Sequence, residues 1–404
     1  MNHFEKQEAE HLPTTVTDED LANAITDEHG AKYSPDGKRL LRGLDIGTYE
    51  IKAGTEVICD NAFWGCSSLR QINIPDSVTS IGYGAFRDCR SLEQINIPDS
   101  VTRIESGAFW GCKSLEQINI PDSVTSIGDW AFEDCKSLEI ITIPSSVRTI
   151  GENPFVGCTC TITCHSPHFK VVDNVLYNSD LTRLISFLSE QTDFTIPDSV
   201  AVIGDSAFYR RESLQKIHIP GSVTKIGRSA FWGCTSLWQI YIPNGVTAIG
   251  EYAFDHCTSL RQIYIPDGVT RIENGAFSYC ESLRQITIPD SVTAIGYSAF
   301  WGCSSLEQIT IPSSVTSIGD MAFWGCSSLE QINIPDSVTS IGDGAFGHCT
   351  SLRQIYIPSS VTSIGGGAFI ICESLQTILI PRGSRKRFKR LLPDYKDKLV
   401  EAGD

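Results

Sequence analysis

The sequence has no long apolar run and no excess of basic residues. Its 404 residues carry 32 Lys and Arg against 48 Asp and Glu, a formal net charge of -16. No stretch approaches the ~20 consecutive apolar residues of a membrane-spanning helix, and residues 1–8 are too polar for a secretory signal. We therefore predict a cytoplasmic protein without a transmembrane segment. The acidic charge argues against nucleic acid as a partner, because phosphate binding depends on Lys and Arg.

Motifs of the common enzyme classes are also missing. The sequence has no Gly-rich phosphate loop, no His-Glu-x-x-His and no nucleophile elbow. Its Ser, His, Asp and Glu residues recur with the repeat described next, so nothing marks one place where they converge. Because catalysis needs a pocket with a converging acid, base and nucleophile, we predict no enzymatic activity and no cofactor.

A repeat of 23 residues fills most of the chain, and its prolines mark it. In the unit that begins at Leu92, Ile95 and Ile97 alternate with polar residues, which indicates a short strand ended by Pro98. A second extended piece covers residues 101–104, and Ala108-Phe109 favours one helical or 3-10 turn. The prolines stand at 75, 98, 121, 144, 167, 197, 220, 243, 266, 289, 312, 335, 358 and 381, and only the interval from 167 to 197 departs from 23.

One such coil buries too little apolar surface to offset the entropy of ordering 23 residues. Stacked coils cover each other's apolar edges and pair their strands. The repeat therefore predicts a mostly β, α/β-type repeat solenoid with one parallel sheet and short helical or 3-10 turns.

The repeat resembles the BspA-like leucine-rich repeat family. The resemblance rests on Leu-x-x-Ile-x-Ile-Pro, Val-Thr-x-Ile-Gly and Ala-Phe-x-x-Cys, and it covers roughly residues 50–381. It implies a right-handed leucine-rich repeat solenoid that binds a protein or extracellular-matrix ligand, often at bacterial cell surfaces. A cell-surface or secreted location is therefore the alternative to the cytoplasmic one.

Departures from the repeat predict how the chain is divided. Thr17 favours a short helix after a patternless stretch over residues 1–16, and Ser34-Pro-Asp-Gly37 is a turn signal. The seven extra residues between Pro167 and Pro197 predict strands over 171–177 and 183–187 around a polar turn. We expect a polar N-terminal tail with a possible short helix over 1–29, a capping hairpin over 30–50, the solenoid over 51–381 with an irregular 30-residue coil at 167–197, and a capping helix over 382–404.

Two residue types recur at fixed points of the coil. Thirteen phenylalanines from Phe63 to Phe369 predict a buried spine. Twelve cysteines predict a column of buried, reduced thiols, because strand-like stacking does not give disulfide geometry. Five tryptophans that follow the phenylalanines form either a second contact edge or packing between coils: Trp64, Trp110, Trp232, Trp301 and Trp324.

The segment 158–168 holds the only cluster of metal-ligand residue types at short spacing. Its uncommitted members are Cys160, His165 and His168. Their spacing fits no familiar zinc site, and structural zinc needs four converging ligands. We predict no metal, and the sequence leaves open whether these three residues bind one.

The outward side of the strands is the most informative surface. One column is almost entirely glutamine, from Gln71 to Gln354, and stacked amides can hydrogen-bond along a sheet. The next column varies and becomes aromatic near Tyr241. The predicted contact residues, of types that interface hot spots favour, are Trp238, Tyr241, Arg261, Tyr264, Arg284 and Tyr356. The alternative is that these aromatics serve only strand propensity.

These patterns predict a non-enzymatic protein-binding solenoid, adhesin-like or a scaffold for recognition. The alternative is an intracellular structural or scaffold module with no extracellular ligand. A third possibility is that the basic segment from Arg382 to Arg390 docks on an acidic membrane or partner instead of only capping the solenoid. The sequence does not indicate an oligomeric state.

Overall fold

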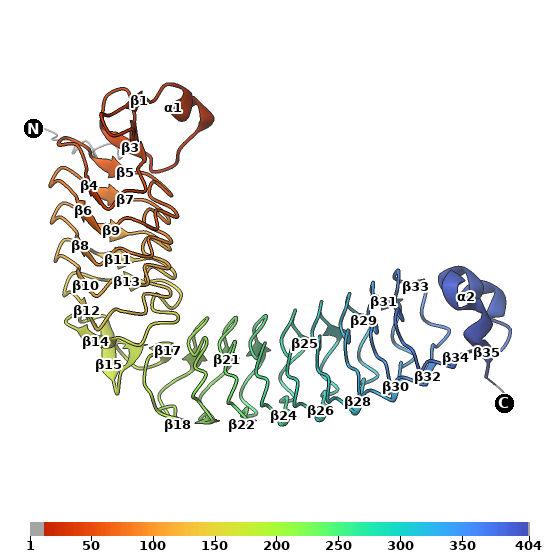
Figure 1. Ribbon diagram of the computed structural model, residues 1–404. Coiled ribbons are helices and arrows are strands. Elements are labelled where there is room, and N and C mark those ends of the chain that lie inside the picture. The colour runs from red at the N-terminus through yellow and green to blue at the C-terminus, as the bar shows by residue number, and fades with distance from the viewer. Residues whose placement is uncertain (1–11, 403–404) are drawn as a thin grey trace, which may run out of the picture. The chain divides into compact units, whose positions relative to one another are not determined.

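The computed structural model describes residues 12–402 as stacked coils, so the predicted repeat solenoid is confirmed (Figure 1). The coils form two compact units that divide between Ser179 and Asp180. Both units are built mainly from strands of two to five residues. Each unit has its own parallel ladders and is described separately.

The first unit contains two stacks of strands. One stack is β1 Ile25–Thr26, β2 Lys32–Tyr33, β3 Arg39–Arg42, β5 Val57–Ile58, β7 Ser80–Ile81, β9 Arg103–Ile104, β11 Ser126–Ile127 and β13 Thr149–Ile150. The other consists of β4 Thr48–Glu50, β6 Gln71–Asn73, β8 Gln94–Asn96 and β10 Gln117–Asn119, followed by the pair β12 Ile140–Ile143 and β14 Thr161–Cys164. Apart from β1 and β2, all these strands pair in parallel.

The second unit repeats this plan. One side carries β17 Arg183–Phe187, β19 Val202–Ile203, β21 Lys225–Ile226, β23 Ala248–Ile249, β25 Arg271–Ile272, β27 Ala294–Ile295, β29 Ser317–Ile318, β31 Ser340–Ile341 and β33 Ser363–Ile364. The other side, called here the long-strand face, carries β18 Asp193–Thr195, β20 Lys216–His218, β22 Gln239–Tyr241, β24 Gln262–Tyr264, β26 Gln285–Thr287, β28 Gln308–Thr310, β30 Gln331–Asn333, β32 Gln354–Tyr356, β34 Thr377–Ile380 and β35 Leu399–Glu401.

Each coil therefore contributes to two parallel stacks, where the sequence analysis expected one sheet. The first strand of a coil exposes its outer residues and buries the central isoleucine, as in Gln94-Ile-Asn96. The second buries its isoleucine wholly or in part, wholly at Ile127, and there pairs in the same register with the coils on either side. A strand of two residues carries little alternation in the sequence, so the pattern alone does not predict this second stack.

The segment around each phenylalanine is neither a helix nor a 3-10 helix. Asn61, Phe63 and Gly65 donate N–H groups to the carbonyls of Tyr83, Ala85 and Arg87 one coil later, each at 2.8 Å. The same segment has positive φ at Asn61 (57°) and Gly65 (73°), which breaks a right-handed helix at both points. The predicted helical turn is thus wrong, and the segment forms a third ladder between coils.

Two columns fill the interior. The thirteen phenylalanines are buried, as predicted, and neighbouring rings within each unit stack with centroids 4.9 to 5.8 Å apart. The twelve column cysteines are also buried, and all fifteen cysteines are free. From Cys89 onward each column thiol donates to the phenylalanine carbonyl of the preceding coil in its unit, at 3.0 to 3.3 Å.

The N-terminal cap holds more of the chain than a tail would. Helix α1, Asp18–Ala22, has a capping box between Thr17 and Asp20, and hydrogen bonds from Thr17 and Arg39 lower the pKa of Asp20 to about 2. Arg39 lies 2.7 Å from Asp20 and donates to the carbonyls of Pro13 and Thr15. Residues 12–16, expected to be part of a polar tail, are therefore bound to the cap; residues 1–11 lie outside the described range.

The irregular coil contains the polar turn predicted within 178–182, followed by the predicted strand over 183–187 as β17, and also an earlier turn that the sequence did not predict. Strands β15, Phe169–Val172, and β16, Val175–Asn178, pair antiparallel around Asp173 and Asn174. Both turn residues have positive φ, 50° and 60°, which Asp and Asn tolerate and which two-residue hairpin turns require. The strand predicted over 171–177 is thus wrong, because a turn of two residues divides it.

The C-terminal cap begins with α2, Arg385–Leu391, which buries Phe388. A 3-10 helix, η1, Pro393–Lys398, follows, and the ring of Tyr395 covers Phe369 edge-on at 5.8 Å, where the phenylalanine column ends. Leu399–Glu401 then pairs with β34 as the strand β35, which a capping helix over 382–404 did not foresee. Neither helix of residues 12–402 is long and apolar enough to cross a bilayer.

Candidate protein-binding surface

Five of the six predicted contact residues lie together on three neighbouring strands of the long-strand face. Tyr241 ends β22 and Tyr264 ends β24, and these strands pair at Gln239 and Gln262, so the two rings belong to one column. Trp238, Arg261 and Arg284 occupy the position just before the glutamine in three successive coils. We call these five residues the aromatic-basic patch; its strands lie along the lower edge of the second unit in Figure 1.

Strand alternation points Tyr241 and Tyr264 away from the core, and Trp238, Arg261 and Arg284 are exposed at the residue just before each strand. Tyr241 is 55%, Tyr264 40% and Trp238 38% exposed, and both arginines are exposed. The isoleucines between them, Ile240 and Ile263, are buried at 5% and 3% and anchor the strands. A rigid backbone thus carries large side chains whose apolar surface is left open to water, and single exposed aromatics become a contact surface when they cluster.

Lys216 belongs beside the patch, although the sequence analysis did not single it out. Its Nζ lies 5.1 Å from the ring centroid of Trp238, which is a cation–π contact. Lys216 pairs in register with Gln239 and so occupies a place in the glutamine column. That break in the column was the available signal for an altered surface.

A shallow groove borders the patch. Gln215, Trp238 and Arg261 line it together with three serines from successive coils, Ser236, Ser259 and Ser282. The groove gives a partner hydrogen-bond donors and acceptors next to the indole ring. An interface of this kind has an aromatic anchor with a polar rim.

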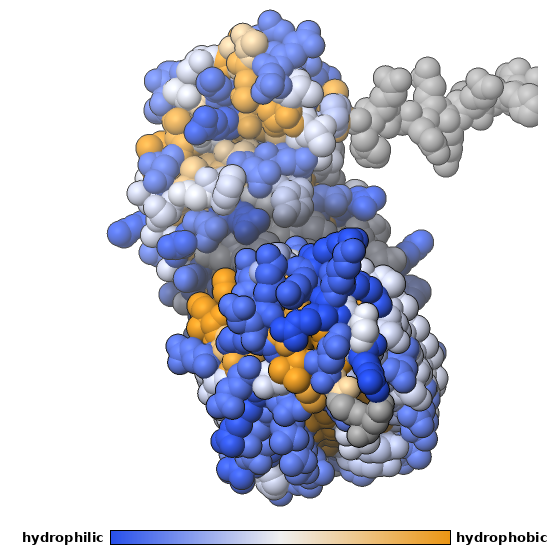
Figure 2. Space-filling model, turned by 90° about the vertical axis from the view of Figure 1, so that its right-hand side faces the viewer, coloured by the Kyte–Doolittle hydropathy of each residue, from blue (hydrophilic) through white to orange (hydrophobic). Residues whose placement is uncertain are grey.

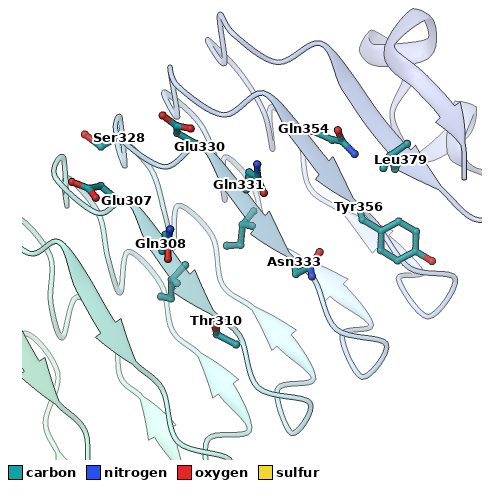
Figure 3. Close-up of a pocket in the computed structure, with 12 residues that line it drawn as sticks. Glu307, Gln308, Thr310, Ser328, Glu330, Gln331, Asn333, Gln354, Tyr356 and Leu379 are labelled. Carbon is teal, nitrogen blue, oxygen red and sulfur yellow. The ribbon is translucent and has the colours of Figure 1, made fainter.

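Tyr356, the sixth predicted residue, lies apart from the patch. It ends β32 and pairs with Asn333 and Leu379 on the neighbouring strands, while Tyr264 pairs with Thr287. Tyr356 lines a separate groove of about 790 Å³, and Figure 3 shows its ring at one edge of the amide and carboxylate side chains. Glu307 and Glu330 make this second groove acidic, in contrast to the arginines of the patch.

The glutamine column does not form the expected hydrogen-bonded ladder. Within residues 12–402, no hydrogen bond joins the side-chain amides of neighbouring glutamines from Gln71 to Gln354. These side chains are exposed in every coil, so water satisfies them equally well. In the first unit, Gln71, Gln94 and Gln117 line a groove with Asn73, Asn96 and Asn119, and the amides there are available to a ligand.

Most of the tryptophans that follow the column phenylalanines pack against side chains of neighbouring coils. Trp232 stacks on Tyr209 with ring centroids 4.5 Å apart and donates from Nε1 to Asp255 at 2.9 Å. The Arg87 guanidinium lies 3.7 Å from the centroid of Trp110. Trp64 differs, because it is 62% exposed. Of the two interpretations offered by the sequence, coil-to-coil packing fits these residues except Trp64.

The three residues whose metal binding was left open do not converge. Cys160 is buried, while His165 and His168 are exposed. In the described part of the chain, no group of three or more His, Cys, Asp or Glu side chains is placed to hold a metal ion. The side chains therefore offer no preformed coordination site.

The thiols of the cysteine column have low reactivity. Burial raises the pKa of Cys66 to about 11 and that of Cys234 to about 12, and it raises the pKa of Cys280 well above its usual value. Nucleophilic attack and metal ligation both need the thiolate. The column is thus a structural element, with its thiols kept protonated by the core.

The repeat is also what matches when the sequence is compared with known protein families. The model of the BspA type leucine rich repeat region matches in six copies over residues 40–182, 186–307 and 270–390. Among the curated proteins compared with this sequence, none matches.

Two solved structures share the architecture. A leucine-rich repeat protein from Eubacterium ventriosum is 27% identical, with a TM-score of 0.65, and the match covers 75% of this chain and 82% of that one. A leucine-rich repeat protein from Bacteroides ovatus is 30% identical, with a TM-score of 0.54, and the match covers 94% of this chain and 97% of that one. A leucine rich cell surface protein from Faecalibacterium prausnitzii is 31% identical over 85% of this chain and 75% of that one, with a TM-score of 0.39.

Proposed function

Because this chain belongs to the BspA-type leucine-rich repeat family, we propose that it is a non-enzymatic protein-binding solenoid whose contact surface is the aromatic-basic patch. The observation that carries the proposal is the clustering of Trp238, Tyr241 and Tyr264, 38 to 55% exposed, at the two neighbouring strands β22 and β24. Trp, Tyr and Arg are the residue types that contribute most to protein interfaces.

The strand ladder favours binding by a preformed surface. Tyr241 and Tyr264 stand on paired strands, and the backbone of Trp238 is fixed by a hydrogen bond from its N–H to the carbonyl of Gln215 at 3.2 Å. Little conformational entropy is then lost when a partner binds, and preorganisation of this kind raises affinity. The exposed Arg261 and Arg284 suit a protein partner with carboxylates near its own contact residues.

The non-enzymatic part of the proposal rests on what lines the grooves. The groove beside the patch is lined by amide, hydroxyl, indole and guanidinium groups, and the groove at Tyr356 by amides and by Glu307 and Glu330. Both are open depressions on a sheet face that admit water, whereas catalytic sites require desolvated, converging acid and base groups.

We further propose an adhesin-like role at the bacterial cell surface with a protein or matrix ligand, supported by membership of the family. The competing proposal is a scaffold inside the cell. Brief protease treatment of intact native cells distinguishes them: loss of the protein before cytosolic markers are lost supports the surface role. Full protection of the chain until the cells are lysed rejects it.

The patch is tested by affinity capture with the whole chain as bait, followed by measurement of the captured protein's Kd. Changing Trp238→Ala together with Tyr264→Ala should weaken binding at least 100-fold, on the order of 3 kcal/mol, with the melting temperature unchanged. The matched control is Trp64→Ala with Tyr83→Ala, two aromatics 62% and 41% exposed outside the patch. Equal affinity of the two double variants would exclude the patch as the contact surface.

Tyr356 is proposed as an outlying contact rather than as part of the patch. Tyr356→Ala alone should then weaken binding far less than the double variant, since its ring stands in the separate acidic groove. A loss as large as that of the double variant would indicate instead that the partner contacts the groove on β28, β30, β32 and β34.

A further inference from the structure

The C-terminal cap gathers positive charge on an otherwise acidic chain. Residues 382–402 hold eight of the 32 Lys and Arg and only three carboxylates, while the whole chain has a net charge of -16. Figure 2 turns this end of the second unit toward the viewer, and strongly hydrophilic side chains there surround smaller hydrophobic areas. The three carboxylates belong to Asp394, Asp397 and Glu401.

Two of these cations help to close the solenoid. Arg387 donates to the carbonyls of Ser359 and Val361, and Lys398 donates to the carbonyl of Leu375 at 2.6 Å. Five others are exposed and lie in no ion pair with a carboxylate of residues 12–402: Arg385, Lys386, Lys389, Arg390 and Lys396. Lys389 and Arg390 suit the last turn of α2, where the helix dipole favours cations, but no carboxylate of the described residues neutralises the charge of the five.

Apolar side chains are exposed next to this charge. Ile370 is 43% and Ile371 47% exposed, and they directly follow Phe369, whose ring packs against Tyr395 beside Lys396. Ile371 has φ of +56°, a conformation that is costly for a β-branched side chain. The equivalent position in the other twelve regular coils also has positive φ but holds Gly, Asp, Arg, His or Tyr, so Ile371 is the one β-branched residue there.

Backbone N–H groups beside Ile371 also lack hydrogen-bond acceptors among the described residues. In the preceding coil Gly344, Phe346 and His348 donate N–H groups to the carbonyls of Gly366, Ala368 and Ile370. The matching N–H groups of the last coil, those of Gly367, Phe369 and Ile371, find no acceptor among the described residues. A row of donors in the last coil, covered in part by the cap that carries the five cations, favours a surface rich in anionic acceptors.

We propose that this cationic end face, made by the five free cations with Ile370 and Ile371, docks the solenoid on a bilayer that contains anionic phospholipid. Charge complementarity favours an anionic surface. Exposed isoleucines beside Lys and Arg favour a lipid interface over a soluble polyanion, because apolar side chains gain from insertion between headgroups. The surface lies outside the aromatic-basic patch and does not depend on the protein partner.

The test uses the full chain and sedimentation with vesicles of phosphatidylcholine, with and without phosphatidylglycerol. We expect binding only when phosphatidylglycerol is present, and weaker binding as salt is added. Each Lys or Arg near such a surface strengthens binding about fivefold. Replacing Arg385, Lys386, Lys389 and Arg390 with Gln should therefore weaken binding several-hundred-fold, on the order of 500-fold.

A matched control removes the same charge elsewhere. Arg70, Lys113, Lys170 and Lys225 are exposed and lie in no ion pair within the described residues. Their replacement with Gln should change vesicle binding less than tenfold, since they lie on other coils. Equal losses in the two quadruple variants, or no binding of the unaltered chain to phosphatidylglycerol vesicles, would overturn the proposal.

Substitution of an exposed isoleucine distinguishes binding to a lipid surface from binding to a soluble polyanion. Ile371→Asn places a residue that tolerates positive φ, so it should raise the melting temperature while weakening vesicle binding severalfold. Heparin serves as the soluble probe, and its binding should not change in this variant. If heparin binds more tightly than the vesicles and Ile371→Asn leaves vesicle binding unchanged, the surface recognises a soluble polyanion and the lipid assignment is wrong.

Discussion

Raising the pH above 9 should unfold the second unit through its cysteine column. Seven column thiols, Cys234 to Cys372, are buried there, and burial raises every one of their pKa values above the ordinary 9.0. The unfolded chain releases these protons near pH 9, while the folded chain keeps them. Stability is therefore fully present below pH 9 and falls as the pH rises toward the folded pKa values, of which the lowest is about 11.

The magnitude follows from proton linkage. One pH unit above 9, ionisation of each thiol in the unfolded chain favours unfolding by about 1.4 kcal/mol. Seven thiols in one cooperative unit give about 10 kcal/mol, which is comparable with the whole free energy of unfolding of a typical domain, roughly 5–15 kcal/mol.

The assay is urea unfolding at pH 7, 8, 9 and 10 in a thiol reductant, followed by circular dichroism. The comparison variant carries Cys280→Ala and Cys303→Ala, which leave the Phe254 and Phe277 carbonyls without their Sγ donors. It should be less stable at pH 7 but lose about 2 kcal/mol less than the unaltered chain between pH 9 and 10. An identical loss in both proteins would refute the thiol explanation.

Three further predictions concern single sites. Phe254→Ala, which removes a fully buried ring stacked 5.2 and 5.6 Å from its neighbours, should lower the free energy of unfolding by about 3–5 kcal/mol, measured by urea unfolding of the second unit. Cys164, the one cysteine of intermediate exposure, should react with iodoacetamide before the column thiols at pH 8, as peptide mass mapping would show. Arg39→Ala removes the donor to Pro13 and Thr15, so limited proteolysis should cut within residues 12–16 before it cuts the coils; uncut residues 12–16 would contradict this anchoring.

The repeat made the interior predictable from the sequence. A residue that recurs every 23 positions occupies the same place in each coil, so the burial of Phe254 or Cys280 follows once stacking is inferred. The outward direction of Tyr241 and Tyr264 follows from the alternation of a strand. These predictions succeeded because each depends on the repeat. With twelve or thirteen copies of the same position, an exception in one coil does not hide the pattern.

Features without periodicity were the ones missed. The turn at Asp173-Asn174 interrupts a run of β-forming residues once, and only its two positive φ angles reveal it as a turn. The binding of residues 12–16 depends on Arg39, which lies more than 20 positions away and is recognisable only in three dimensions. The ladder through Asn61, Phe63 and Gly65 was missed because backbone hydrogen bonds between coils leave no side-chain pattern.

The regular spacing of the backbone bonds also governs how the molecule can change in size. Bonds within the ladders join residues 22 to 24 positions apart, as from Phe254 to Ala276, from Thr293 to Thr270 and from Gly250 to Ile226. Excision or duplication of any 23 consecutive residues inside a regular stretch brings an equivalent acceptor opposite every donor. Unequal recombination between the near-identical coding segments would therefore yield shorter or longer variants that still fold, with the distance between the patch on β22–β26 and the capped end altered in whole coils.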